Sequence, residues 1–146
     1  MEIHIKSFED LSKKELYEIL RLRSEVFIVE QQGCYQDLDR IDYESTHIFT
    51  MDAAGCSGCL RVFKKEDEGR TCQLGRLVVR QRMQGLVRKL METAEEIAAG
   101  DYGCCHLFLT GRRSARGFYE ACGYTASLPE GFTWENTPYY LFRKEL

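Results

Sequence analysis

The sequence lacks any long hydrophobic segment. No apolar run in its 146 residues approaches the roughly 20 residues that a transmembrane helix needs. The first ten residues, MEIHIKSFED, also lack the apolar core of a secretory signal peptide. These two absences argue against a membrane-spanning protein and lead us to expect a cytoplasmic one.

A strong excess of charge of one sign is also missing. The formal net charge is -3, so no general electrostatic field attracts the chain to nucleic acid or to an anionic membrane. We therefore expect neither of these as a partner. The length and the 44% of hydrophobic residues predict one globular domain, spanning residues 1–146, with a core of ordinary size.

Cysteine, in contrast, is abundant, with seven in the chain. In a reducing compartment most cysteines are small buried hydrophobic residues. Cys56 and Cys59 form a lone C-x-x-C pair, and zinc would need two more ligands at matching spacing. A turn followed by a strand explains the same residues, so we expect no metal, and a thiol or zinc role is the less favoured alternative.

Hydrophobic periodicity and capping signals predict a mixed α/β domain. Ser12 and Glu15 have the spacing of a capping box, which opens a helix that reaches about Phe27. Periodicity does not decide whether residues 26–29 continue this helix or leave it as extended chain. The other expected elements are strands near residues 3–8, 46–51, 59–63, 71–79, 106–110 and 139–143, and helices near 85–100 and 114–122.

The polar stretch from residue 30 to residue 45 is too long for a tight turn. We expect an ordered loop or a short helix at the functional edge of the domain. Asp37, Asp39 and Asp42 lie close together in it. Such a group either attracts a cationic substrate or is simply solvated. Arg76, in a predicted strand, either holds a carboxylate or extends its charge to the sheet edge.

The stretch from Leu74 to Met91 combines an apolar strand, a short basic loop and an amphipathic helix. Gly85 stands where this helix begins. Free backbone N–H groups at a helix start form an anion site, and Arg80, Arg82 and Arg88 add positive charge around the turn. The stretch therefore predicts a site for a phosphorylated ligand. The alternative is a basic loop that caps an ordinary helix.

Two segments together resemble a known family. They are the turn RMQGLV at residues 82–87 and the segment FYEACGY at residues 118–124. This pair resembles the signature of the GNAT superfamily of acetyl-CoA-dependent N-acetyltransferases. The block LRSEVFIVEQ at residues 22–31 and the pair Thr46-His47 are similar to the ElaA-type members. The resemblance covers about residues 16–143. It implies a central, mostly antiparallel sheet of about six to seven strands flanked by helices, with acetyl-CoA as co-substrate.

Two positions depart from the family pattern. Val87 stands where the family has glycine or alanine, and its side chain is expected to lie close to the pyrophosphate of coenzyme A. Pro138 is followed by Tyr139, whereas ElaA-type sequences have a histidine after this proline. The first departure concerns cofactor affinity and the second concerns the base.

The resemblance implies that backbone groups bind most of the cofactor. The edge of the strand at residues 77–79 would pair with the pantetheine amides, and an N–H near Val78 would bind the acetyl oxygen. The full set of implied cofactor-binding residues is Leu77, Val78, Val79, Arg82, Met83, Gln84, Gly85, Leu86, Val87, Arg88, Ser114 and Tyr119.

Tyr119 is the main catalytic candidate, because in the superfamily the tyrosine of this segment often protonates the departing thiolate. Its alternative role is an ordinary core aromatic residue. An alkylammonium with a pKa near 10 must lose a proton before it attacks, and Glu30 and His47 are both candidate bases. Three possibilities stay open for the base: Glu30 through a water, His47 directly, or no assigned base.

The sequence thus predicts an N-acetyltransferase that acts on a primary amine of a small molecule or peptide. The amine would attack directly in a ternary complex, because no thiol lies in an evident Cys/His arrangement for an acyl-enzyme. The alternative is a GNAT-fold protein that binds an acyl-CoA without turnover, as a sensor or interaction module. A homodimer is possible under either reading.

Overall fold

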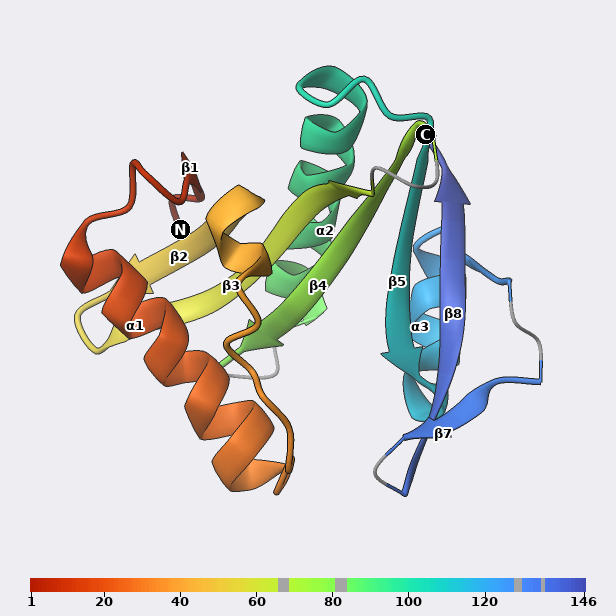
Figure 1. Cartoon of the computed structure of the whole chain (residues 1–146), viewed down its shortest axis with the longest axis horizontal. Helices are drawn as coiled ribbons and strands as arrows, with labels where there is room; N and C mark the ends of the chain where they lie inside the picture. The colour runs from red at the N-terminus through yellow and green to blue at the C-terminus, as the bar shows by residue number, and fades with distance from the viewer. Residues whose placement is uncertain (66–68, 81–83, 128–129, 135) are drawn as a thin grey trace.

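The computed structural model describes residues 1–65, 69–80, 84–127, 130–134 and 136–146. An eight-stranded sheet crosses the molecule in the order β1-β2-β3-β4-β5-β8-β6, and β7 pairs with β8 (Figure 1). All neighbouring strands are antiparallel except β4 and β5, which are parallel. The expected mixed α/β fold with a mostly antiparallel sheet is therefore confirmed.

Most of the predicted elements begin and end close to their expected residues, but the strand expected at 59–63 begins at residue 55, so Cys56 lies within the strand and not in the expected turn. The strands are β1 (His4–Ser7), β2 (Thr46–Asp52), β3 (Gly55–Lys65), β4 (Thr71–Val79), β5 (His106–Arg112), β6 (Thr125–Ala126), β7 (Phe132–Trp134) and β8 (Thr137–Glu145). The helices are α1 (Lys13–Arg23), α2 (Gln84–Gly100) and α3 (Arg116–Ala121), with the helical segments η1 (Ser24–Glu30), η2 (Ile41–Glu44) and η4 (Arg113–Ala115). No helix in these described ranges is long and apolar enough to cross a membrane.

The first helix begins at the predicted capping box. The Ser12 hydroxyl accepts a hydrogen bond from the Glu15 amide at 3.0 Å, and the Ser12 amide donates to the Glu15 carboxylate at 2.8 Å. At its far end α1 runs directly into η1, a π-helix of seven residues. Residues 26–29 therefore continue the helix, in a wider form that is common next to functional sites.

Helices cover both faces of the sheet. Neighbouring residues of a strand point to opposite faces, so Ile48 packs in the larger core beneath α2 while Phe49 packs in the smaller core beneath α1. Leu90 of α2 and Leu22 of α1 are almost fully buried in these two cores. Two covered faces fix the position of β3 and β4 at the centre of the molecule.

The sheet opens between β4 and β5. In the described part of the chain these strands pair only from Thr71 to Gln73 on β4 and from His106 to Phe108 on β5. Beyond this point they diverge, as Figure 1 shows. The pairing of β4 with β3 shifts register between Cys59 and Arg61, and the Arg76 backbone has a φ of 53° there. A bulge of this kind bends a strand and increases its twist.

The strand count exceeds the expected six to seven because β6 and β7 are too short for their alternation to be recognised. The helix expected near residues 114–122 is divided into the 3₁₀ turn η4 and the helix α3. Both differences lie in the C-terminal third of the chain.

Candidate functional site

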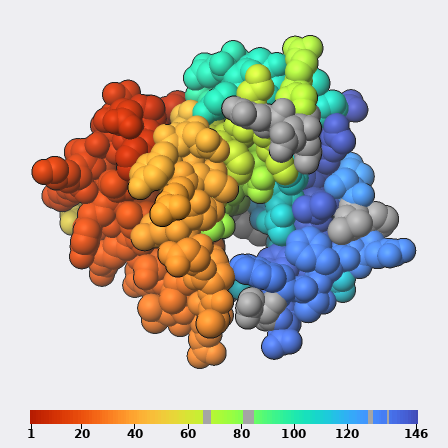
Figure 2. Space-filling model, in the orientation of Figure 1, coloured from red at the N-terminus to blue at the C-terminus, as the bar shows by residue number. Residues whose placement is uncertain are grey.

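Two cavities meet in the opening between β4 and β5. The first, which we name the aromatic cavity, has a volume of about 330 Å³ and lies between the edges of β4 and β5, the end of η1 and the β7–β8 hairpin. The second, the helix-end cavity, measures about 650 Å³ and lies between the end of β4, the start of α2 and the η4–α3 segment. The surface is hollowed here between N-terminal segments in orange and C-terminal segments in blue (Figure 2). Both cavities are lined by Phe27, Gln31, Leu77, Ala115 and Tyr119.

The helix-end cavity contains several of the predicted cofactor-binding residues. Its wall includes Leu77, Val78 and Val79 of β4, Val87 of α2 and Ser114 of η4. The amides of residues 84–87 form the first turn of α2, and within the described ranges no group outside the helix accepts a hydrogen bond from them. Such amides, beside a strand edge with no partner, fit an extended ligand that carries a diphosphate.

The other predicted cofactor-binding residues do not all lie on the wall of the helix-end cavity. Arg82 and Met83 lie outside the described residues. The side chain of Leu86 is buried in the larger core, which leaves only its backbone for a ligand. The guanidinium of Arg88 lies 5.7 Å from the centre of the Phe118 ring. Arg80 lines the helix-end cavity, but its guanidinium forms an ion pair with Asp52.

Val87, the position that departs from the family pattern, lies on the wall of the helix-end cavity. It also packs against the larger core and is half-buried. The valine thus faces both the core and the predicted cofactor position, and it narrows the cavity next to the start of α2.

Tyr119 occupies the junction of the two cavities. Its ring packs against Phe142 at 4.8 Å, Phe118 at 5.5 Å and Tyr124 at 6.4 Å, measured between ring centres. Burial, with a smaller contribution from the Cys122 thiol, raises the pKa of Tyr119. The phenol therefore keeps its proton at neutral pH, and it lies where it can donate that proton to a group in either cavity.

Gly111 of β5 holds the Tyr119 ring in this position, and sequence reasoning missed it. A Cβ atom at residue 111 would lie 2.5 Å from Cε2 of Tyr119 and 3.0 Å from Cε2 of Phe142. Only a residue without a side chain allows the ring to pack this closely on the strand. The sequence held no signal for this contact, because β5 and α3 meet only after folding.

Replacing Gly111 by alanine is expected to displace the Tyr119 ring. Overpacking of this kind costs about 1–3 kcal/mol of unfolding free energy. Thermal unfolding and steady-state turnover would measure the two effects. Gly100→Ala is the matched control, because a Cβ there meets nothing within 4 Å. A Gly111→Ala variant with the melting temperature and turnover of the original chain would contradict this role.

The two candidate bases are placed differently. Glu30, the last residue of η1, is exposed and lines the helix-end cavity beside Tyr119. His47 of β2 is 2% exposed and lines neither cavity. Its Nε2 lies 2.9 Å from the Asp42 carbonyl oxygen, and burial lowers the pKa of His47. Glu30 and Tyr119 therefore line the same cavity, whereas His47 is buried within the fold.

Asp37, Asp39 and Asp42 are neither simply solvated nor open to a cationic ligand, because arginines already pair with them. Arg23 binds Asp37 at 3.0 Å and Asp42 at 2.7 Å. Arg61 binds Asp39 through both terminal nitrogens at 2.7 Å, and it also reaches Asp42 at 3.1 Å. Both interpretations from the sequence were wrong, because the arginines that neutralise the aspartates lie on α1 and β3, distant in the sequence.

Arg76 completes this network and does hold carboxylates. Its guanidinium lies 2.7 Å from Asp37 and 3.2 Å from Asp39, and it also lies 5.6 Å from the centre of the Tyr35 ring. The bulge in β4 turns this arginine toward the loop. The network thereby fixes the loop, and with it Tyr35, against the aromatic cavity.

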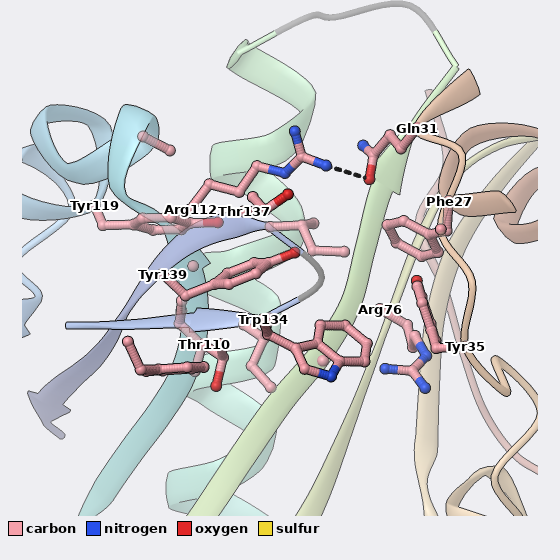
Figure 3. Close-up of a pocket in the computed structure, with 18 of the residues that line it drawn as sticks. Phe27, Gln31, Tyr35, Arg76, Thr110, Arg112, Tyr119, Trp134, Thr137 and Tyr139 are labelled. Carbon is pink, nitrogen blue, oxygen red and sulfur yellow. Dashed lines mark hydrogen bonds between the residues drawn. The ribbon is translucent and has the colours of Figure 1, made fainter. Parts of the chain in front are cut away.

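The aromatic cavity is walled by rings from both halves of the molecule. Tyr35 comes from the N-terminal loop, and Trp134 and Tyr139 come from the β7–β8 hairpin (Figure 3). The ring centres of Tyr35 and Trp134 are 4.9 Å apart, and those of Trp134 and Tyr139 are 6.2 Å apart. Sequence reasoning did not select these residues, although the aromatic density of residues 132–140 was a signal. Tyr139, at the position where the family resemblance led us to expect a histidine, lines the aromatic cavity.

The C-x-x-C pair lies inside the sheet. Cys56 and Cys59 are 3% and 2% exposed on β3. Across the described ranges, no three His, Cys, Asp or Glu side chains form a group that could hold a metal ion. The pair packs in the smaller core beneath α1, as small buried thiols do.

Comparison with known proteins gives a consistent result. Residues 14–124 match the model of the Acetyltransferase (GNAT) family. A UPF0039 protein of Schizosaccharomyces pombe is 31% identical over 100% of this chain and 98% of its own. The protein ElaA of Escherichia coli is 28% identical over 79% of this chain and 78% of its own.

Solved structures resemble the whole chain. An acyl-CoA N-acyltransferase from Pseudomonas aeruginosa superposes with a TM-score of 0.89, with 27% identity over 99% of both chains. The crystal structure of Escherichia coli ElaA also superposes with a TM-score of 0.89, at 25% identity over 99% of both chains.

Proposed function

The chain belongs to the GNAT family of acetyltransferases and is of the ElaA type, and from this premise we propose that it transfers an acetyl group from acetyl-CoA to a primary amine of a small molecule or peptide. One observation carries the proposal: the two cavities meet at Tyr119, beside the unpaired edge of β4. A donor that enters through one cavity and an acceptor that enters through the other would meet at this phenol.

Backbone groups are proposed to hold the donor. The unpaired edge of β4 pairs with the amides of pantetheine, and the first-turn amides of α2 bind the pyrophosphate. Acetyl-CoA, when bound, supplies an acetyl group in a thioester. A backbone N–H near Val78 then stabilises charge on the acetyl oxygen, a contribution typically worth ~10²–10³ in rate.

The side chains of the junction are proposed to manage the protons. The amine nitrogen attacks the acetyl carbon directly, and the carbon–sulfur bond breaks. Tyr119 donates its phenolic proton to the departing sulfur, because its raised pKa keeps that proton in place until a thiolate forms. Glu30, exposed on the wall of the helix-end cavity, takes the amine proton through a water.

A second candidate is binding of an acyl-CoA without turnover. It is favoured by Tyr139, which lines the aromatic cavity where ElaA-type sequences place a histidine. A phenol is a poor base at neutral pH. On this reading the chain would be a sensor or an interaction module that uses the same cofactor position.

Saturating acetyl-CoA is expected to raise the melting temperature well above the shift given by adenosine. At a concentration 100-fold above Kd the stabilisation is about 2.7 kcal/mol, which is about 5–10 °C for a chain of this length. Thermal unfolding with each ligand measures the shift. No shift would contradict both readings.

A panel of amines, scored by released free thiol, then separates the two candidates. Release that depends on an amine supports the acetyltransferase. A thermal shift without release from any amine supports the binding protein instead.

A further inference from the structure

Aromatic rings form most of the wall of the aromatic cavity on the side away from the start of α2. Phe132, Trp134 and Tyr139 form a continuous set of contacting rings on the hairpin, and Tyr35 extends it from the opposite half. Trp134 is 44% exposed, so this set also reaches the mouth of the cavity. Figure 3 shows the labelled rings arranged round the space between β4 and β5. A flat apolar group is the chemistry that fits such walls.

The same cavity also holds a guanidinium group that forms no ion pair with any of the described residues. Arg112, at the end of β5, is exposed, and its guanidinium donates one hydrogen bond of 2.8 Å to the neutral side-chain oxygen of Gln31 (Figure 3). Arg76 differs, since two aspartates already meet its charge. No Asp or Glu is among the described residues that line the aromatic cavity. A carboxylate on the ligand would supply the missing partner for Arg112, in the forked geometry that guanidinium favours.

The positions of these groups define the order of the ligand's parts. Arg112 and Tyr119 both line the aromatic cavity, and Tyr119 also reaches the helix-end cavity. A reactive amine must therefore lie close to the carboxylate, while the ring extends toward Trp134. An α-amino acid meets this requirement, because its amine, its carboxylate and its side chain are all attached to the α-carbon.

We propose that the acceptor is an aromatic α-amino acid. The ring packs among Tyr35, Trp134 and Tyr139, the carboxylate replaces Gln31 on the guanidinium of Arg112, and the α-amine points to the junction. This inference rests on the proposed acetyltransferase function and specifies its acceptor. The products are the N-acetyl amino acid and free coenzyme A.

Binding can be measured without turnover, because Trp134 is the single tryptophan of the chain. Its fluorescence is expected to change on titration with L-phenylalanine in the presence of coenzyme A. Phenylethylamine, which lacks the carboxylate, and L-alanine, which lacks the ring, are both expected to bind about tenfold or more weakly. Spermidine, a polycation, is expected to give no change. Equal or tighter binding of phenylethylamine, L-alanine or spermidine would overturn the proposal.

Arg112→Gln provides the specific variant. It is expected to weaken L-phenylalanine about tenfold or more and to leave phenylethylamine unchanged, because only the first ligand carries the carboxylate. Arg143→Gln removes the same charge from an exposed position of β8 that lines neither cavity, and it should change neither ligand. An equal loss for both ligands in Arg112→Gln would show a structural role and contradict the proposal.

The same ligands in the thiol-release assay separate this inference from the function on which it rests. Faster release of free thiol with spermidine than with L-phenylalanine would support the acetyltransferase function but overturn the proposal that the acceptor is an aromatic amino acid. Binding of L-phenylalanine without release from any amine overturns the transferase and keeps the amino acid as a ligand. No fluorescence change and no release with L-phenylalanine overturns the acceptor.

Discussion

Replacing Tyr119 by phenylalanine is expected to lower turnover about 100-fold while the apparent affinity for acetyl-CoA changes little. General acid catalysis typically contributes ~10²–10⁴ in rate, and this substitution removes only the hydroxyl that would supply the proton. The ring keeps its contacts with Phe118 and Phe142, so the fold is expected to remain intact. Steady-state kinetics with separate kcat and KM values for acetyl-CoA would measure the effect.

The pH dependence gives this prediction a second readout. Because burial raises the pKa of Tyr119, the phenol stays protonated through neutral pH. On the alkaline side, the activity of the original chain is expected to fall as pH rises through that raised pKa. Tyr119→Phe should lack this alkaline fall.

Tyr124→Phe is the matched control for this substitution. It removes a hydroxyl from the same aromatic cluster, but Tyr124 lines neither cavity. Its turnover should stay close to that of the original chain. Unchanged turnover in Tyr119→Phe would remove the acid role from this residue.

Replacing Asp42 by alanine is expected to cost about 3–5 kcal/mol of unfolding free energy. Asp42 is 6% exposed and accepts hydrogen bonds from Arg23 and Arg61, which are 1% and 3% exposed. Without Asp42 these buried guanidinium groups keep only their other aspartates. Such a loss is a large part of the ~5–15 kcal/mol that stabilises a typical domain. Denaturant titration would measure it.

The pH dependence of Asp42 has a definite sign. Burial would raise its pKa, but hydrogen bonds and charge from Arg23, together with the charge of Arg61, outweigh burial and hold the pKa below its ordinary value. A carboxylate with a lowered pKa stabilises the fold above the unfolded value, near 3.8, and this contribution is lost as pH falls through the folded pKa. The difference in unfolding free energy between the original chain and Asp42→Ala should therefore be constant near neutral pH and become smaller in acid.

Glu120→Ala is the control for Asp42. Glu120 pairs with Arg116 at 3.2 Å, but this pair is exposed on α3. Its loss should cost no more than about 1 kcal/mol. If Asp42→Ala is no less stable than Glu120→Ala, the buried network contributes little to the fold.

The elements that the sequence predicted well are those whose signal is local. Ser12 and Glu15 marked the start of α1, and the apolar run at residues 77–79 marked the end of β4, because both signals depend on near neighbours. The start of α2 near Gly85 was predicted for the same reason, whereas residues 81–83 of the preceding loop lie outside the described residues. The strands β6 and β7 were not predicted, because two or three residues are too few to show an alternation of apolar and polar side chains.

The parts of the site that were not predicted depend on distant contacts. Asp42 binds Arg61, which lies on a strand 19 positions further along the chain, and no local sequence pattern predicts such a pair. Gly111 is required because the Tyr119 ring lies against it, which depends on how α3 folds back onto β5. Trp134 and Tyr35 are about 100 positions apart in sequence and become neighbours only across the opening in the sheet. Tyr119 could be selected as a candidate from the sequence because its family segment is contiguous.

The separation of β4 from β5 has a consequence for what can enter the molecule. An outer sheet edge accepts any strand that arrives from solution, which makes such edges prone to aggregation. The bare main chain of β4 lies in the interior instead, with the diverging C-terminal half on its other side. This interior position is expected to exclude a folded partner and to admit a single extended chain. The opening between β4 and β5 is thus expected to select ligands by their width before any side chain contacts them.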